Sequence, residues 1–294
     1  MAQVSNSSGP MQATSWKVWL GVVPFFLFAV LFLLSPSFRL LTASFSAPDG
    51  SFTFDNIRQL FTEPLIVNSY RLSIQISAVT ALGGGIFGFL LAYSVTVGGL
   101  PKPLRSILVT FSGVASNFAG VPLAFAFVAT LGRQGFMTAI LKDVFNVDMY
   151  EAGFNLYSFA GLSLVYMYFQ FPLMVLIMAP ALDGLKKEWR EAAENLGANT
   201  TQYWLRIAMP VLLPSILGAM ILLFGNAFGA YATAYALTGG RLGLVTIQIG
   251  AQIRGDVLYN PGLGYAMAVG MVIIMAVSLG GYSWLQSKTE RWLK

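Results

Sequence analysis

Long apolar runs recur along the chain, separated by shorter stretches that carry most of its charged residues. Six runs are long enough for an apolar α-helix to cross a bilayer, which takes roughly 17 to 25 residues. We therefore predict an all-α membrane protein whose transmembrane domain covers residues 16–285. The predicted spans are about 18–34, 72–97, 107–131, 156–182, 211–237 and 262–285.

Both ends of the chain are polar. Residues 1–15 predict a flexible cytoplasmic tail and residues 286–294 a short basic one. The first apolar run could instead be a cleaved signal peptide, whose core is usually about 7–15 residues long and precedes a small-residue cleavage site. The run over 18–34 is longer and continues directly into Pro36 and Arg39, which favours an uncleaved first span.

The amino-acid composition excludes several classes of protein and of functional site. Hydrophobic residues make up 56% of the 294 residues and charged residues only 10%, whereas soluble domains carry about 25% charged residues. Cysteine and histidine are absent, which removes disulfides, thiolate or imidazole metal ligands and the usual nucleophile–base pairs. The glycine cluster Gly83–Gly85 lies in an apolar run without the lysine of a phosphate-binding loop. We expect no metal site, no ATP hydrolysis by this chain and no enzyme.

The distribution of charge predicts the orientation. Six spans place both termini on one side, and the segments on that side hold ten of the 17 Lys and Arg residues but five of the 12 acidic residues. Cytoplasmic loops carry an excess of Lys and Arg, so we predict cytoplasmic termini. The net charge of +5 is then explained by the basic cytoplasmic loops that set the membrane orientation, and no nucleic-acid partner is expected. The segments counted are 1–17, 98–106, 183–209 and 286–294.

The segment 183–214 predicts two short helices on the cytoplasmic face. Gly197 is a natural helix stop, and Asn199 can cap a second helix with Gln202 in the capping-box position. The pattern alone leaves open whether this element docks on a protein or rests at the lipid interface. The predicted inner face of the first helix consists of apolar residues at helical spacing, namely Leu185, Trp189, Ala192, Ala193 and Leu196.

The same segment carries the spacing EAA, three residues, Gly, nine residues, Ile-x-Leu-Pro, with Met209 in place of the leucine. This spacing resembles the EAA loop of permease subunits of binding-protein-dependent ABC importers. The six-span layout resembles their type I, MetI-like permease core. The matching residues are Glu191, Ala192, Ala193, Gly197, Ile207 and Pro210.

The resemblance implies a transport subunit of the bacterial inner membrane that docks on an ATPase. The first short helix would be the coupling helix, with Glu191 as its polar contact, Ala192 and Ala193 allowing close packing, and Gly197 making the turn. ATP and Mg²⁺ would bind to the partners, so no cofactor is expected on this chain. The expected partners are two ATPase subunits, a second and different permease chain, a periplasmic substrate-binding protein and membrane lipid.

Polar residues inside predicted spans are candidates for the substrate path, because lipid does not tolerate them. No Asp, Glu, Lys or Arg lies clearly inside a span. The alternative role for each polar residue is a hydrogen bond between helices. The first candidates are Asn117, Gln170 and Asn226 near the middles of three spans, with Tyr168 and Tyr231 as aromatic walls.

The cargo is the least defined feature. The sequence resembles the permeases of polyamine, ferric-iron, thiamine and phosphonate importers most, and a polyamine such as spermidine or putrescine, or a related small organic solute, is the first hypothesis. Aromatic rings can hold an organic cation where no acid is present. The alternative from another class is a stand-alone secondary transporter or channel, which predicts in-span charges or inverted repeats of broken helices, and neither is evident in the sequence.

Overall fold

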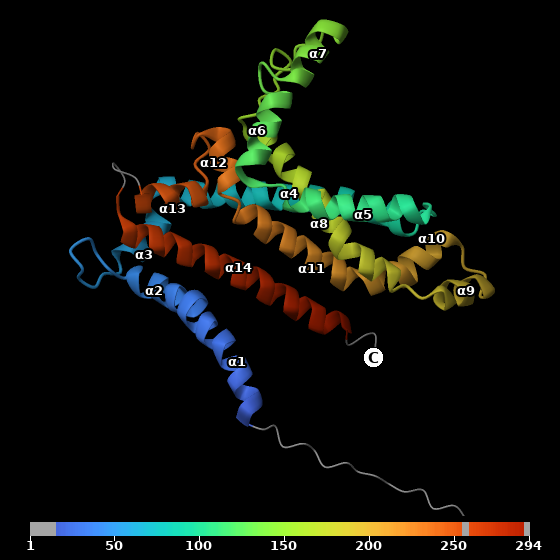
Figure 1. The fold of residues 1–294 in the computed structure, drawn as a ribbon, viewed down its shortest axis with the longest axis horizontal. Coiled ribbons are helices and arrows are strands. Elements are labelled where there is room, and N and C mark those ends of the chain that lie inside the picture. The colour runs from blue at the N-terminus through green and yellow to red at the C-terminus, as the bar shows by residue number, and fades with distance from the viewer. Residues whose placement is uncertain (1–15, 255–258, 291–294) are drawn as a thin grey trace, which may run out of the picture.

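The computed structural model describes residues 16–254 and 259–290 (Figure 1). Within these ranges the chain is helical without strands, which confirms the predicted fold class. The elements in chain order are α1 (Trp16–Phe28), η1 (Ala29–Leu34), α2 (Ser35–Ala43), α3 (Asp55–Thr62), α4 (Pro64–Thr96), α5 (Lys102–Asn117), α6 (Gly120–Leu131), α7 (Phe136–Phe145), α8 (Phe159–Asp183), α9 (Lys187–Asn195), α10 (Thr200–Tyr203), η2 (Trp204–Ala208), α11 (Met209–Phe228), α12 (Ala232–Thr238), α13 (Val245–Arg254) and α14 (Pro261–Glu290).

Six helical segments in the described part of the chain are long and apolar enough to cross a membrane, as predicted. The predicted tail from residue 286 begins inside α14, which continues to Glu290. The tail predicted over residues 1–15 lies outside the described residues. The six segments are Gly21–Ala43, Pro64–Thr96, Gly120–Phe145, Phe159–Asp183, Thr200–Phe228 and Pro261–Ser287.

Two predicted spans are not single helices. The run over 107–131 breaks between α5 and α6, where Gly120 has a φ of +75° that residues with a Cβ rarely adopt. The run over 211–237 breaks after α11, and α12 follows as a separate short helix. The N-terminal end of α11 extends further than predicted, because the π-helical turn η2 joins α10 to α11 without interruption.

The centre of the fold is the packing of α4, α8 and α11 against one another. Gly84 and Gly88 of α4 face Gln170 and Met174 of α8, and a Cβ on either glycine would come within 2.6 Å of the facing Cβ. Small residues at this spacing let two membrane helices approach closely. The Gln170 side-chain amide also donates a hydrogen bond to the Leu223 carbonyl of α11 at 2.9 Å.

Two parts of the chain extend away from this centre. α1 leans away from the other helices, and α6 and α7 project from the side of the bundle (Figure 1). α6 packs mainly on α12, and α7 packs on α6. Both parts expose large apolar side chains, including Phe25 and Phe26 of α1 and Phe136 and Phe145 of α7. This exposure fits a chain surrounded by lipid or by other membrane subunits.

Candidate functional site

A cavity of about 480 Å³ lies where α5 and α11 both end. Its lining combines small residues, which leave backbone groups accessible, with a few polar side chains. Non-helical backbone at membrane depth is tolerated only where it is buried in protein or lines a cavity. Two helix breaks that meet at one cavity therefore mark the best candidate for a transport path. The lining includes Ser116, Phe169, Asn226, Gly229, Tyr231 and Thr233.

Hydrogen bonds hold the two helix breaks together. The backbone N–H of Gly120, at the start of α6, donates to the Thr233 hydroxyl of α12 at 2.7 Å. The Tyr166 hydroxyl of α8 donates to the carbonyl of Ala230 at 2.7 Å, within the break after α11. Asn117, the last residue of α5, donates to the Gly113 carbonyl at 2.9 Å. Each break is thus fixed by at least one hydrogen bond to another helix.

The charge beside the cavity is positive. The Arg254 guanidinium carbon lies 5.7 Å from the centre of the Tyr231 ring, which is within the range of a cation–π interaction. Tyr231 also stacks on Tyr235 at a centroid distance of 5.4 Å. No Asp or Glu lines this cavity in the described ranges. Arg254 was not among the predicted path residues, because it lies outside the predicted spans and contacts the cavity only through Tyr231.

The loop between α8 and α11 forms a compact element. α9 ends at Asn195, Gly197 makes the turn with a φ of +80°, and α10 follows. The predicted capping box is present, since the Asn199 side chain accepts from the Gln202 N–H at 2.8 Å and the Gln202 side chain accepts from the Asn199 N–H at 2.9 Å. Ala193, Tyr203 and Ala208 are its buried core, supported by Leu185, Trp189, Ala198, Trp204 and Ile207.

The predicted inner face of α9 is wrong in two positions. Leu196 is 88% exposed and Ala192 is also exposed, whereas Ala193 is buried. The helix ends one residue before Leu196, so helical spacing no longer decides where that side chain points. Glu191 and Gly197 are exposed as well. The free surface of the loop therefore combines an acidic side chain, an alanine and a large apolar side chain.

A continuous helical segment connects this loop to the cavity. It runs from Thr200 to Phe228, 29 residues that correspond to about 43 Å at 1.5 Å per residue. Its first turn belongs to the loop, and Asn226 near its other end lines the cavity. The loop and the cavity thus lie at opposite ends of one helical segment.

Comparison with known proteins assigns the chain to a family. The family described as "Binding-protein-dependent transport system inner membrane component" matches residues 84–291. The chain belongs to this family. It is a multi-pass membrane protein and an ABC importer permease subunit, and hence a transport component rather than an enzyme. The stand-alone transporter or channel considered from the sequence is excluded by this membership.

Several relatives of the permease differ in cargo. The spermidine/putrescine transport system permease protein PotB of Haemophilus influenzae is 26% identical over 90% of this chain and 92% of its own length. A probable sulfate transport system permease protein, cysT of Helicosporidium, is 27% identical over 72% of this chain and 73% of its own length. The sulfoquinovosyl glycerol permease protein SmoG of Agrobacterium fabrum is 25% identical over 84% of this chain and 79% of its own length.

A solved structure supports the fold of the permease. A chain of a bacterial ABC transporter that imports the polysaccharide alginate superposes with a TM-score of 0.71. The match covers 95% of this chain and 96% of that chain at 17% sequence identity. At this identity the likeness concerns the fold, and the MetI-like six-span core expected from the sequence is confirmed.

The predicted path residues of the permease lie in different surroundings. Asn226 and Tyr231 line the cavity, and Asn117 lies beside it at the end of α5. Tyr168 packs edge-on against Phe118 and Phe127, at centroid distances of 6.2 Å and 5.8 Å. Gln170 is fully buried between α8 and α11 and does not line the cavity. The cavity residues that sequence reasoning did not select include Thr233 and the backbone of Gly229 and Ala230.

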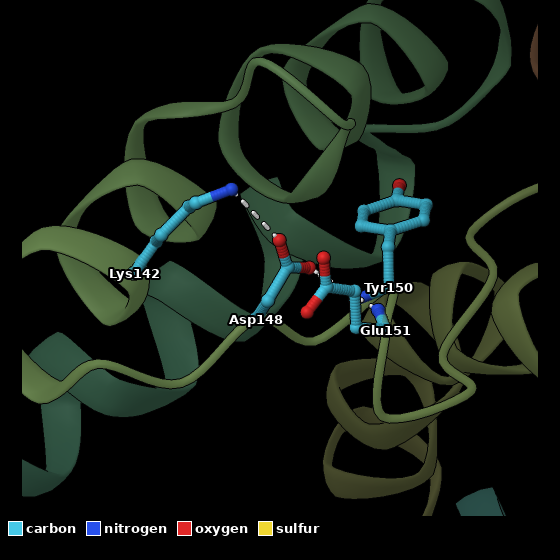
Figure 2. Close-up of polar contacts among 4 residues, drawn as sticks. All are labelled: Lys142, Asp148, Tyr150 and Glu151. Atoms are coloured by element: carbon cyan, nitrogen blue, oxygen red, sulfur yellow. Dashed lines mark hydrogen bonds and ion pairs between the residues drawn. The ribbon is translucent and has the colours of Figure 1, made fainter.

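The connector between α7 and α8 is organised by one carboxylate (Figure 2). Asp148 accepts hydrogen bonds from the Lys142 ammonium at 3.0 Å and from the backbone N–H groups of Tyr150 at 3.0 Å and Glu151 at 3.2 Å. The Lys142 hydrogen bond is the largest contribution that holds the pKa of Asp148 below its usual value of 3.8. The connector is therefore expected to lose order in acid.

We predict that amide hydrogen exchange in residues 146–152 becomes about two- to fivefold faster in Asp148→Asn at neutral pH, as for the loss of an exposed ion pair. A carboxyl with a depressed folded pKa stabilises above its unfolded pKa, and this contribution disappears as the pH falls through the folded pKa. The difference between wild type and variant should thus persist at pH 5, shrink as the pH falls below 3.8, and vanish only below the folded pKa of Asp148, which is lower than 3.8. A difference that did not change with pH would exclude the carboxylate as its cause.

Proposed function

We propose that the permease forms one half of the transport path for a small solute, which a periplasmic binding protein delivers and ATP hydrolysis on separate subunits drives. The observation that supports this most directly is the helix from Thr200 to Phe228, because it connects the EAA loop to the cavity at the helix breaks. The proposed complex contains two ATPase subunits that bind ATP and Mg²⁺, and a second permease that is a different chain. Both termini of this permease would be cytoplasmic, in a bacterial inner membrane.

The proposed ATPase-docking surface is the loop around Gly197. Glu191 and Ala192 are exposed on α9 and can contact the partner, while Ala193 packs on the loop's own core. Ile207 supports that core, and Pro210 begins the regular part of α11. The exposed Leu196 would add an apolar contact next to the turn.

The proposed motion is a two-state rearrangement. Closure of the ATPases on ATP would move the docking loop, and α8 and α11 would transmit the displacement to the cavity. An ion pair between Arg105 and Asp183, at 2.5 Å, ties the start of α5 to the end of α8 beside the loop. Of the helices that frame the cavity, α5 and α11 are thus both connected to the docking side.

The proposed contacts with cargo are Asn226 and Tyr231 in the cavity wall, with Asn117 at its edge. Tyr168 and Gln170 would act indirectly, by positioning α8 against α5, α6 and α11. Asn226 is exposed in the described structure, so its amide is available to a solute.

For the cargo itself we keep a polyamine as the first candidate. PotB is similar over 90% of this chain, and the stacked Tyr231 and Tyr235 rings offer aromatic faces to a cation. A small oxyanion is the second candidate, favoured by Arg254 and by the absence of carboxylates in the described cavity lining. Ferric iron, thiamine and phosphonate remain alternatives because of the family resemblance noted in the sequence analysis.

We predict that Asn226→Leu and Tyr231→Leu each reduce uptake about tenfold, because each removes a polar or aromatic group from the cavity wall. The complex should still assemble and hydrolyse ATP. Gln75→Leu is the matched control, since Gln75 is an exposed polar residue of α4 that does not line the cavity. Uptake of labelled spermidine and labelled sulfate by cells that express the complete importer measures the effect.

The same assay separates the two cargo candidates. Arg254→Gln should increase spermidine uptake if the cargo is a cation, because the side chain no longer occupies the Tyr231 ring. It should decrease sulfate uptake if the cargo is an oxyanion. Unchanged transport in both cavity variants would show that this cavity is not the path.

A further inference from the structure

A second pocket, of about 620 Å³, lies at the C-terminal end of α12. The N-terminal end of α12 lines the transport cavity, and its seven residues correspond to about 10 Å. α8 begins beside this pocket and ends at the docking loop, 25 residues or about 37 Å away. The pocket is therefore on the face opposite the docking loop. Its polar lining is Arg133, Asn155, Tyr157, Thr238 and Arg241.

The pocket is rich in hydrogen-bond donors and lacks carboxylates in its lining. Neither Arg133 nor Arg241 has an ion-pair partner among residues 16–254 and 259–290. Each guanidinium has five N–H donors and no acceptor. The Asn155 carbonyl oxygen accepts from the Tyr157 backbone N–H at 2.9 Å, which leaves the Asn155 amide hydrogens for a ligand.

Arg133 is held in place by its neighbours. Its guanidinium carbon lies 5.1 Å from the centre of the Tyr150 ring. The Tyr150 hydroxyl donates to the Leu131 carbonyl at 2.9 Å, and its backbone N–H donates to Asp148 (Figure 2). A side chain that is already ordered loses less entropy when it binds a ligand.

Arg241 is positioned by a turn that requires glycine. Gly239 and Gly240 have φ angles of +58° and +82°, a combination that residues with a Cβ rarely adopt. The Arg241 N–H then donates to the Thr238 carbonyl at 3.1 Å, which closes the turn. The chain thus reverses directly after α12, and Arg241 lines the same pocket as Arg133.

We propose that this pocket binds an oxyanion group of the sulfate or phosphate type. Arg133 and Arg241 both line this pocket without an ion-pair partner in the described residues, and an oxyanion between them would accept charge-assisted, bidentate hydrogen bonds from the guanidiniums. The oxyanion could belong to a free ion or to a lipid headgroup, which share this chemistry. The proposal holds whichever cargo crosses the cavity, because binding at the pocket requires no ATP and no movement of the docking loop.

The test measures binding of ³⁵S-sulfate to the complete, purified importer in phosphatidylcholine nanodiscs. We expect saturable binding that spermidine does not displace, with affinity at least about tenfold weaker in Arg133→Gln and in Arg241→Gln. Arg58→Gln is the control, since Arg58 is an exposed arginine of α3 that does not line the pocket. Arg241→Lys keeps the positive charge but loses the bidentate geometry, so its sulfate affinity should lie between those of the wild type and Arg241→Gln. A folding defect would not depend on the retained charge in this way.

A second arm identifies the source of the oxyanion. If the pocket takes a lipid headgroup, phosphatidylglycerol in the nanodisc should weaken sulfate binding to the wild type, and Arg133→Gln and Arg241→Gln should retain less phosphatidylglycerol on purification. Either source supports the proposal. Equal sulfate binding together with equal phosphatidylglycerol retention by wild type and both glutamine variants overturns it. Absence of both sulfate binding and phosphatidylglycerol retention overturns it as well.

Discussion

Gly197→Val is expected to reduce ATP-driven uptake at least tenfold while the chain still inserts and folds. Gly197 has a φ of +80°, and a Cβ there would meet nothing within 4 Å, so the substitution strains the backbone without a clash. Left-handed backbone costs an L-residue roughly 1–2 kcal/mol, and the cost is greatest for a β-branched side chain. The turn would relax to another conformation, and α9 would leave the position from which Glu191 is proposed to contact the ATPase. Co-purification of the ATPase subunit and uptake into proteoliposomes measure the outcome.

Gly99→Val is the matched control for this experiment. Gly99 has a φ of +74°, and a Cβ there would also meet nothing within 4 Å, but it lies in the connection between α4 and α5. The backbone strain is thus the same in a different loop. Gly197→Asn should be tolerated much better than Gly197→Val, because asparagine adopts left-handed backbone more readily. Normal assembly and uptake in Gly197→Val would refute the docking surface.

The sequence predicted the structure of the loop between α8 and α11 well, because that structure is determined locally. The capping box needs only Asn199 and Gln202, three residues apart, and the turn needs only a glycine at position 197. Leu196 was placed wrongly because the prediction extended helical spacing one residue beyond the end of α9. Local patterns thus define the elements but not the direction of side chains at their ends.

The cavity at the two helix breaks, which is the proposed transport path, could not be predicted in the same way. The breaks after α5 and α11 lie inside continuous apolar runs, and the hydrogen bond from Gly120 to Thr233 joins residues far apart in sequence. Hydropathy also cannot distinguish Gln170, buried between two helices, from Asn226, which lines the cavity. Both are amides in the middle of apolar spans. Which one is accessible depends on helix rotation, which packing decides.

Gly88→Val is expected to destabilise the permease by about 3 kcal/mol, the upper part of the range for overpacking a core. A Cβ on Gly88 would lie 2.6 Å from the Met174 Cβ and 3.0 Å from the Phe171 carbonyl oxygen. These atoms belong to the backbone of α8 or are attached directly to it, so only separation of α4 from α8 relieves the contact. The shift of the unfolding transition in detergent, followed by far-UV circular dichroism, measures the loss.

Gly83→Val on the same helix is the control for Gly88→Val. A Cβ on Gly83 would overlap with Met167, but the Met167 atom is Cε, at the end of a flexible side chain that can rotate away. Both variants change the helix propensity of α4 equally, so only the contact with α8 differs. Equal destabilisation would show that the loss comes from α4 itself. A much larger loss of stability in Gly88→Val would show that the loss comes from the contact between α4 and α8. Because α8 leads into the docking loop and its Tyr166 hydroxyl binds the Ala230 carbonyl at the cavity, uptake should fall together with stability.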